Sequence, residues 1–517
     1  MNLIDQEARD EILEDNGNIV ISASAGSGKT TIMVNKMNKV LQEIEDHKTI
    51  AAITFTVKAS KEIKKKVGIN TENSLSVQTN DSFIESEIIR PFIQDALGSD
   101  YNREYSVEYD GVYKFSSFEE GLNQLKSMNV LGTYRDNHLN FNFRLALIII
   151  KNSIACQEYI KSKYAMIFID EYQDTDSDMH RFFMWLKNNL SIKLFIVGDS
   201  KQAIYLWRGA MSNVFELLSN ENFSAYELVT NFRCDNEIEN YANLFHNPGY
   251  YKHLNNDVNN VILKEFPSKG RNFVGFLEEF EQLIEDNYVD ILKDITIIAN
   301  FNRDAQLITD ILNKNGYNFV YIPRTPIDEG IPNGHLLKEL AFYIKNESYS
   351  IYDFLSNTQI DERIQTRKDI DKIIKLLKKW ENLDQTMISR AVSNLANYLE
   401  ISISDKEIKK FIESITNRNY DMAFTLLEEK HKVMTVFASK GLEFNQVISF
   451  SRYYRIFNSE HLQNHYVCVT RAINKFIMFI DDHRYHKHLT NVIANEQISN
   501  AGKVFKHIPS INAYIKQ

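Results

Sequence analysis

The chain has 517 residues, of which 44% are hydrophobic and 25% charged. At about 150 residues per domain the length suggests about three domains, and the composition excludes a largely disordered or fibrous chain. The formal net charge is −10, so a bound nucleic acid would have to meet a local basic groove, because the mean field repels phosphate.

The cysteines and the apolar runs limit where this protein can work. The three cysteines lie far apart in the sequence, which excludes a disulfide framework and a cysteine-based zinc site as main features. The longest apolar run, Leu145 to Ile150, is far shorter than the about 18 residues of a membrane-spanning helix. The acidic N-terminus does not read as a signal peptide. We therefore expect a cytoplasmic protein without a membrane partner.

The first half of the chain predicts strands that alternate with helices. We expect strands at 18–21, 49–55, 165–169 and 193–197, and a helix at about 29–44. A lysine-rich helix is expected after the second of these strands. This alternation indicates a parallel α/β sheet, in which ligands lie at the carboxyl ends of the strands.

The second half repeats the pattern around a helical interruption. A second α/β block is expected to begin near Leu228, and its strand–helix pattern resumes at Val433. The predicted fold class is therefore α/β, with two parallel-sheet domains, each interrupted by a smaller and mainly helical insertion. The predicted boundaries are 1–85 and 155–227 for the first domain, 86–154 for its insertion, 228–334 and 431–517 for the second domain, and 335–430 for its insertion.

A glycine-rich loop follows the first predicted strand, where residues 23–30 read ASAGSGKT. A helix that starts after such a loop offers backbone N–H groups and a positive dipole end to phosphate, and Gly26 and Gly28 let the backbone approach closely. In this pattern Lys29 reaches the β and γ phosphates, and Thr30 binds Mg²⁺. Ala23 stands where the strict pattern has glycine, and a structural turn without phosphate is the alternative.

Two adjacent carboxylates follow the third predicted strand, in MIFIDEYQD at 166–174. Asp170 would hold Mg²⁺ through water, and Glu171 would orient or deprotonate the attacking water. A solvated strand end is the alternative for such a pair, but Lys29 and Thr30 upstream favour the catalytic interpretation. ATP and Mg²⁺ are therefore the expected cofactors.

Taken together, these and further segments resemble the UvrD/Rep/PcrA helicases of superfamily 1, from residue 6 to residue 480. The segments, in chain order after the glycine-rich loop, are ITFTVKASKEIKKKV at 53–67, DEYQD at 170–174, VGDSKQAIYLWRGA at 197–210, LVTNFRCDNEI at 228–238, MTVFASKGLEFNQVI at 434–448 and HYVCVTRA at 465–472. The resemblance implies two RecA-like motor domains of the P-loop NTPase class, ATP hydrolysis, and 3′-to-5′ movement on single-stranded DNA.

The resemblance also implies roles at the nucleotide site. Gln6 reads adenine, and Phe232, at a family tyrosine position, stacks on it. Gln202 senses the γ-phosphate, which Arg233 and Arg471 contact from the second domain when the cleft closes. Without the family, a surface residue or an ion pair is the better interpretation of each arginine. The expected nucleotide-binding residues are Gln6, Ala25, Gly26, Ser27, Gly28, Lys29, Thr30, Thr31, Phe232, Arg233, Glu443 and Arg471. The expected catalytic residues are Lys29, Asp170, Glu171, Gln202, Arg233 and Arg471, and the expected metal ligands are Thr30 and Asp170.

The residues expected to contact single-stranded DNA follow from the same resemblance. They are Phe55, Thr56, Lys58, Tyr205, Trp207, Arg208, Thr435, Val436 and Phe437. Tyr205 and Trp207 are spaced to share one face of an extended segment, where aromatic rings stack on bases, and a core aromatic pair is the alternative. Lys58 lies with Lys61 and Lys65 near one face of a helix, for which a merely solvated face is the alternative.

Three positions depart from the family pattern, all on the DNA or coupling side. Asp81 and Phe437 stand at positions where the family commonly has histidine, and Asn302 stands at an arginine position. These departures favour retained hydrolysis over strong unwinding.

The segments between the motifs are short for this family, and no fused nuclease follows the last motif. This compact form is similar to the helicase-like subunits of the Gabija anti-phage systems, which implies an OLD-family ATPase–nuclease as partner in a hetero-oligomer. One alternative is a free-standing UvrD/PcrA-like repair helicase. An alternative of another class is a structural or sensor subunit that binds ATP or DNA with little unwinding.

Overall fold

The computed structural model divides the chain into two compact units, the first made of Met1–Thr230 and Pro326–Thr416 and the second of Asn231–Thr325 and Asn417–Gln517. The residues that the structure describes are 4–55, 63, 66–67, 75–108, 113–246, 248, 251–252, 254, 256–266, 272–323, 325–328, 333–346, 349–358, 360, 364–399, 401, 403–424, 431–455, 459–498 and 500–511. The predictions for Thr56, Lys58, Lys61 and Lys65 lie outside the described residues. The boundaries of the two domains and their two insertions that the sequence predicts remain a prediction.

The first unit contains a six-stranded sheet in the order β10-β1-β9-β8-β2-β3, and every pairing in it is parallel. Its strands are β1 (Ile19–Ala23), β2 (Thr49–Thr54), β3 (Leu75–Thr79), β8 (Tyr164–Ile169), β9 (Lys193–Gly198) and β10 (Ser224–Leu228). The four predicted strands are present, so the α/β class is confirmed. Leu228 ends the edge strand β10 of this first sheet.

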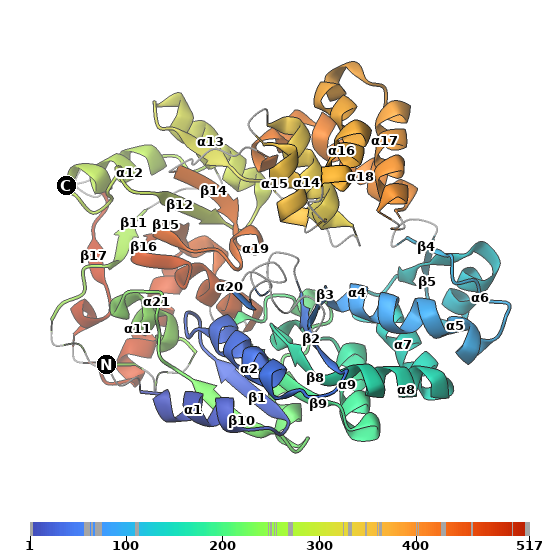
Figure 1. The fold of residues 1–517 in the computed structure, drawn as a ribbon. Coiled ribbons are helices and arrows are strands. Elements are labelled where there is room, and N and C mark those ends of the chain that lie inside the picture. Colours follow the sequence, from blue (N-terminus) through green and yellow to red (C-terminus); the bar gives the residue numbers. More distant parts are fainter. Residues whose placement is uncertain are drawn as a thin grey trace. The chain divides into compact units, whose positions relative to one another are not determined.

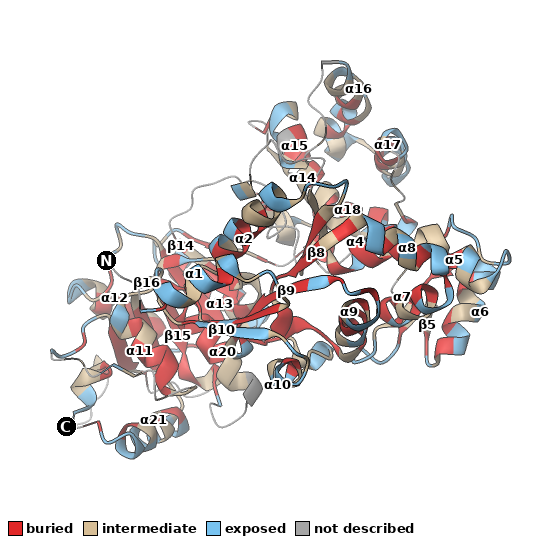
Figure 2. Cartoon of the chain, turned by 60° about the horizontal axis from the view of Figure 1, so that its bottom comes forward, coloured by how far each residue is buried: buried red, intermediate tan, exposed pale blue. Residues whose placement is uncertain are grey.

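Helices pack against this sheet (Figure 1), and two apolar clusters cover its faces, so that β8 and β9 are mostly buried (Figure 2). Side chains alternate along β8, with Ile167 and Ile169 in one buried cluster and Met166 and Phe168 in the other. The second cluster also takes in α1 (Gln6–Glu14) and α2 (Lys29–Glu43), and the first takes in α7 (Phe141–Asn152) and α9 (Ser177–Leu190). Burial on both faces explains why β8 reads as a continuous apolar run.

The remaining helices of the first unit lie after β3 and within 326–416. They are α4 (Asn80–Ile84), α5 (Arg90–Leu97), α6 (Phe118–Met128), α7 (Phe141–Asn152), α8 (Ile154–Lys163), α9 (Ser177–Leu190), α10 (Val214–Ser219), α14 (Gly334–Lys345), α15 (Ile351–Thr358), α16 (Ile364–Ile374), α17 (Gln385–Tyr398) and α18 (Asp405–Thr416). Four two-residue strands form the pairs β4 (Ser106–Val107) with β6 (Val130–Leu131) and β5 (Lys114–Phe115) with β7 (Thr133–Tyr134). The apolar run at 145–150 lies in α7, most of whose residues are buried. Within the described residues, no helix is long and apolar enough to cross a membrane.

The second unit contains a seven-stranded parallel sheet in the order β13-β14-β12-β15-β16-β11-β17. Its strands are β11 (Val261–Glu265), β12 (Ile295–Ala299), β13 (Phe319–Tyr321), β14 (His431–Thr435), β15 (Phe444–Phe450), β16 (Ala472–Ile480) and β17 (Lys506–Ile508). The helices of this unit are α11 (Asn236–Leu244), α12 (Phe276–Glu285), α13 (Asn302–Lys314), α19 (Val436–Ser439), α20 (Ser459–Val469) and α21 (His483–Asn495).

A buried ion pair fixes α12 and the last strand to this second sheet. Lys264 on β11 and Glu279 on α12 both have fully buried side chains, and their Nζ and Oε2 atoms are 2.7 Å apart. The ammonium also donates to the backbone oxygen of Pro509 at 2.7 Å, and the Ser510 hydroxyl donates to Glu279. A buried charge is tolerated only when it is paired and hydrogen-bonded, and this pair meets that condition.

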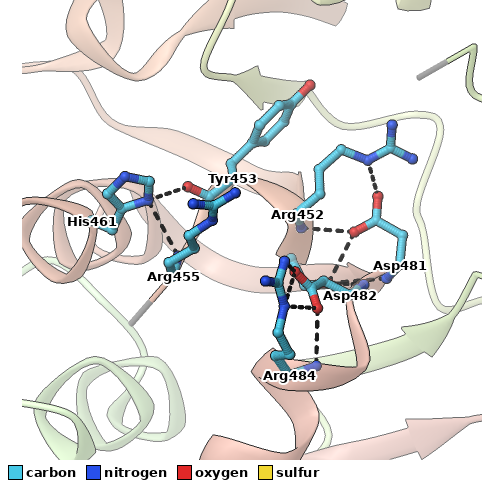
Figure 3. Close-up of polar contacts among 8 residues, drawn as sticks. Arg452, Tyr453, Arg455, His461, Asp481, Asp482 and Arg484 are labelled. Carbon is cyan, nitrogen blue, oxygen red and sulfur yellow. Dashed lines mark hydrogen bonds and ion pairs between the residues drawn. The ribbon is translucent and has the colours of Figure 1, made fainter. Parts of the chain in front are cut away.

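A second group of charged residues lies just after the carboxyl ends of β15 and β16 (Figure 3). Asp481 accepts from the Arg452 side chain and, at 2.7 Å, from the Arg452 backbone N–H. Burial raises the pKa of Asp481 above its ordinary value, although Arg452 opposes the shift. Asp482 begins α21 and accepts from the N–H of Arg484 at 3.0 Å. These contacts fasten the two strand ends to each other within the second unit.

Candidate nucleotide site

The glycine-rich loop joins β1 to α2 in a shape suited to phosphate. Gly26 and Gly28 have φ angles of 73° and 81°, in the left-handed region that glycine adopts without strain. Gly28 immediately precedes α2 and offers no side-chain cap to the first N–H groups of that helix. The Ser27 hydroxyl is buried without a hydrogen-bond partner among the described residues. An uncapped helix start beside an unsatisfied buried donor fits a phosphate group, as the sequence predicts.

Lys29 makes only weak contacts within the loop. Its ammonium donates to the backbone oxygens of Ala23 and Ser24, each at 3.3 Å, and its side chain is half-buried. Ala23, at the position of a family glycine, is buried as the last residue of β1. The ammonium could therefore leave these carbonyls for a phosphate at small cost.

A group of hydrogen bonds centred on Asp5, here called the brace, supports the glycine-rich loop. The sequence did not indicate it. The carboxylate of Asp5 accepts from Arg9 Nε at 2.9 Å and from Thr230 Oγ1 at 2.7 Å, and Arg9 Nη2 donates to the Ser27 backbone oxygen at 2.8 Å. Burial acts to raise the pKa of Asp5, but the hydrogen bonds from Arg9 and Thr230 outweigh it and hold that pKa well below its ordinary value. The neighbouring Gln6, the expected adenine reader, is exposed and donates to Asp10 at 2.9 Å.

The two predicted acids follow β8 directly. Asp170 is 3% exposed, and its backbone N–H donates to Ile53 of β2 at 3.0 Å. Its carboxylate accepts from the Glu171 N–H at 2.9 Å. Glu171 has a φ of 54°, a left-handed conformation that is strained for a residue with a side chain. Such strain at an acid beside a phosphate loop is typical of a functional position.

The neighbouring strand β9 brings a third group to the same edge. Gln202 is buried, and its Nε2 donates to Asp199 Oδ2 at 2.7 Å. Lys201 Nζ donates to Ser24 Oγ at 2.8 Å and so joins this segment to the glycine-rich loop. Because β1, β9 and β8 are adjacent and parallel, the loop, Gln202 and the two acids lie at the carboxyl ends of three neighbouring strands.

The expected nucleotide residues of the second unit also lie close together. Arg233 Nε donates to Glu443 Oε1 at 2.6 Å, and Arg471 Nη1 donates to the backbone oxygen of Leu442 at 2.9 Å. Arg471 is 1% exposed, whereas Phe232 is 58% exposed. Glu443 and Arg471 precede β15 and β16, at the amino ends of these strands. The strand-end rule, which located the acids of the first unit, does not apply to these residues.

The aromatic segment at Tyr205–Arg208 does not have the extended backbone that the sequence analysis expected, so the expectation of an extended segment was wrong. Its contact with DNA remains a prediction. Leu206–Arg208 form a short 3-10 helix, closed by a bond from the Arg208 N–H to the Tyr205 oxygen at 2.8 Å and ended by Gly209 with a φ of 94°. The Arg208 guanidinium lies 5.6 Å from the Tyr205 ring centre and 5.9 Å from the Trp207 ring centre. Trp207 is 45% exposed, which argues against the core aromatic pair.

The other expected DNA residues have mixed surroundings. Phe55 is half-buried after β2 and packs against a core cluster of the first unit. Thr435 caps α19 by accepting from the Ala438 N–H at 3.3 Å, Val436 is fully buried and Phe437 is half-buried. With none of its surface exposed, Val436 offers no side-chain contact to a ligand. Of the departures, Asp81 is exposed in the first turn of α4, and Asn302 is the first residue of α13.

These residues fit ATP and Mg²⁺. Thr30 and Asp170 offer a hydroxyl and a carboxylate, the oxygen ligands Mg²⁺ takes while phosphate oxygens and water fill its other positions. In the part of the chain that the structure describes, no group of three or more His, Cys, Asp or Glu side chains could hold a metal ion without such help.

Comparison of the sequence with known proteins shows the family to which the chain belongs. A family model described as an AAA domain matches residues 5–208. The Gabija protein GajB of Bacillus cereus (strain VD045) is 42% identical over 502 residues, which cover 95% of this chain and 99% of that relative. A probable DNA helicase II homolog of Mycoplasma genitalium is 23% identical over 89% of this chain and 82% of its own. The ATP-dependent DNA helicase Rep of Buchnera aphidicola subsp. Acyrthosiphon pisum is 24% identical over 78% of this chain and 67% of its own. The chain therefore belongs to the GajB family, within the UvrD/Rep-like helicases of superfamily 1.

Proposed function

We propose that this protein is an ATP-hydrolysing motor that moves 3′ to 5′ on single-stranded DNA. We propose further that it is the helicase component of a Gabija-type anti-phage complex with an OLD-family ATPase–nuclease. The observation that carries the motor function is the grouping of the glycine-rich loop, the acids after β8 and Gln202 on three adjacent strand ends. The defence role is supported by the 42% identity to GajB over nearly the full length of both chains.

In the first unit each group has a distinct task. The backbone N–H groups at the start of α2 and the Lys29 ammonium bind the phosphates, because both offer positive charge and hydrogen-bond donors at the same helix start. Glu171 accepts the proton of the attacking water, and Gln202 orients that water. Thr30 and Asp170 would hold Mg²⁺, which would supply positive charge to the phosphate oxygens.

In the second unit the arginines supply positive charge to the γ-phosphate. The guanidinium of Arg233 is held by Glu443, and that of Arg471 is held by backbone oxygens. Neither a carbonyl nor an exposed carboxylate fully neutralises the charge of an arginine, so both remain strong phosphate donors. The exposed ring of Phe232 stacks on adenine, and Gln6 reads its edge.

Each unit has proposed contacts to single-stranded DNA, from the aromatic segment Tyr205–Arg208 in the first unit and from the end of β14 in the second. Trp207 and Tyr205 offer rings to bases without sequence preference, and Arg208 beside them offers charge to phosphate. Thr435 and Phe437 contribute from the end of β14.

The direct test is steady-state ATP hydrolysis with and without single-stranded DNA, with Glu171→Gln as the inactive reference. We expect hydrolysis that DNA stimulates, and an E171Q protein that binds ATP without turning it over. Hydrolysis at the wild-type rate in E171Q would contradict the role of that residue. Turnover that ignores DNA would favour the sensor subunit instead.

The defence role has a separate test. The protein, mixed with the OLD-family ATPase–nuclease of a Gabija-type system, should elute with that partner in size-exclusion chromatography. Separate elution at micromolar concentrations, combined with vigorous unwinding by the isolated chain, would favour a free-standing repair helicase.

A further inference from the structure

Gln173 joins two strand ends of the first sheet through its side-chain amide. The residue lies in the 3-10 helix Tyr172–Asp174 that follows β8, and it is 1% exposed. Its Nε2 donates to Glu171 Oε2 at 2.6 Å, and its Oε1 accepts from the Asp199 backbone N–H at 2.9 Å. Since β8 and β9 are neighbours, one amide thereby spans the segment with the acids and the segment with Gln202.

The amide occupies a space that the partner strand leaves for it. A Cβ atom on Gly198 would lie 2.4 Å from Gln173 Oε1 and 2.9 Å from the ring of Phe215. No real contact is that short, so glycine at 198 is required by the close approach of the amide. The side chain of Gln173 is thus held in one place by packing as well as by hydrogen bonds.

The bond from Gln173 acts on the strained residue of the site. Glu171 has a left-handed backbone with φ 54° and ψ 36°, which costs on the order of 1 kcal/mol for a residue with a side chain. Its carbonyl oxygen accepts from the Asp174 N–H at 3.0 Å, which closes the turn. The Gln173 amide fixes the carboxylate end of the same residue. Backbone and side chain of Glu171 are therefore both determined by residues 173–174.

The chain of bonds continues to Gln202. The Asp199 carboxylate accepts from Gln202 Nε2 at 2.7 Å and from the Lys201 N–H at 3.1 Å. A displacement of Asp199 would therefore move the Gln173 amide and, through it, the Glu171 carboxylate.

We propose that Gln173 is a positioning residue for ATP hydrolysis: its amide fixes the Glu171 carboxylate and ties it to the segment that carries Gln202. This inference rests on the proposed function, because it takes Glu171 as the group that accepts the proton of water. Gln173 itself touches neither water nor phosphate in this scheme. Its contribution is to kcat, since a misplaced carboxylate lowers the rate of proton transfer and leaves phosphate binding intact.

Two substitutions at this position separate positioning from packing. Gln173→Leu keeps the volume and removes the hydrogen bonds, and we expect kcat to fall by about 10- to 100-fold, the value of one hydrogen bond to a charged group, with the KM for ATP changed by less than about threefold. Gln173→Glu keeps the shape and donates only when its carboxyl is protonated. Q173E should therefore also lose kcat at neutral pH, because a carboxylate at position 173 cannot donate to the Glu171 carboxylate and repels it.

Gln446 provides a matched control in the second unit. It is also buried, and its amide also bridges two backbone groups, donating to the Asp290 oxygen at 2.7 Å and accepting from the Asp290 N–H at 2.8 Å. Gln446→Glu should lower the melting temperature but leave the kcat of the folded protein within twofold of wild type. The kcat values are compared at a temperature at which circular dichroism shows that each variant is folded.

The outcomes are distinguishable. A Q173L or Q173E protein with kcat within twofold of wild type would overturn the positioning role. A KM raised as much as kcat is lowered would show a structural role only. If E171Q hydrolyses ATP at the wild-type rate, the proposed function fails instead, whatever Gln173 does.

Discussion

The residues of the candidate site differ in how firmly they are held. Gln202 and Arg471 are buried within hydrogen-bond networks, whereas Lys29 contacts two carbonyl oxygens at 3.3 Å. A loosely held charge at a helix start contributes little to stability and much to phosphate binding. The effects of substitutions on folding and on activity should therefore separate at Lys29.

Lys29→Ala should abolish ATP hydrolysis without unfolding the protein. Removal of the ammonium that the loop offers to phosphate should lower turnover by about 10²-fold or more. The free energy of unfolding should change by less than about 1 kcal/mol, because the hydrogen bonds from Lys29 to the loop are weak. The two measurements are steady-state hydrolysis and a thermal melt. Turnover near that of wild type would contradict the phosphate-site assignment.

Asp5 should make stability depend on pH. Because its pKa is lower in the folded protein than its unfolded value of about 4, its contribution is complete above that value and is lost as the pH falls toward the folded pKa. Asp5→Asn should destabilise the first unit by about 2 kcal/mol at neutral pH, and by progressively less in acid. Denaturant unfolding at several pH values measures this. Glu7→Gln, on the exposed side of α1, is the control, and an equal loss at every pH would refute the prediction.

At the scale of elements, apolar strands were predictable and edge elements were not. The strands β1 and β8 are buried on both faces, so each reads as a run of apolar residues between turns. The edge strand β10 is mostly exposed, with the sequence SAYEL, and carries no such signal. The brace from Asp5 to Thr230 was invisible for a related reason: it depends on β10 lying beside β1, a long-range pairing.

The same distinction explains the candidate site. The glycine-rich loop and the acids were found because each is a local pattern beside a buried strand. The 3-10 helix at Leu206–Arg208 was missed because Gly209 closes a turn against the backbone of His138, where a Cβ would come within 2.7 Å of the His138 Cα. Gln173 was missed because its importance depends on the spatial neighbours Gly198 and Asp199. Assignments of individual residues to ATP or DNA remain predictions.

The 3-10 helix presents Trp207 to solvent, and this exposure leads to a prediction. Trp207→Ala should weaken binding to single-stranded DNA by about 1–3 kcal/mol, the worth of one stacked base, with little change in stability. Fluorescence anisotropy with a labelled oligonucleotide measures the affinity. Trp380, whose ring lies 4.1 Å from the Lys345 ammonium, is the matched control. Equal affinity in W207A and wild type would show that this ring does not stack on a base.

At the scale of the whole molecule, the described residues form two large parallel sheets, one in each compact unit. Each unit combines two stretches of sequence, and each has buried polar ties of its own. We therefore expect the chain to depart from two-state unfolding, because each unit can unfold by itself.

Lys264→Met should expose this independence. Removal of one partner of the buried pair leaves Glu279 as an uncompensated charge, which costs about 3–5 kcal/mol. Calorimetry should show one transition lowered and another unchanged, and an ATP analogue at about 100 times its Kd should still stabilise the first unit by about 2.7 kcal/mol. Lys293→Met, which removes an exposed lysine, is the control. A single transition that shifts as a whole would contradict separate melting.

The order of the strands in the second sheet has a consequence for synthesis on the ribosome. Strand β11 pairs with β16 and β17, both of which follow it by roughly 200 residues or more. At about 5–20 residues per second, β11 waits on the order of 10 to 40 s for its partners, while all six strands of the first sheet have emerged by Leu228. The nascent chain therefore carries a finished first sheet and an apolar, unpaired β11 for most of this interval. During translation this strand therefore has to be kept from pairing with other chains. In the folded protein that need is gone, because β16 and β17 cover both of its edges.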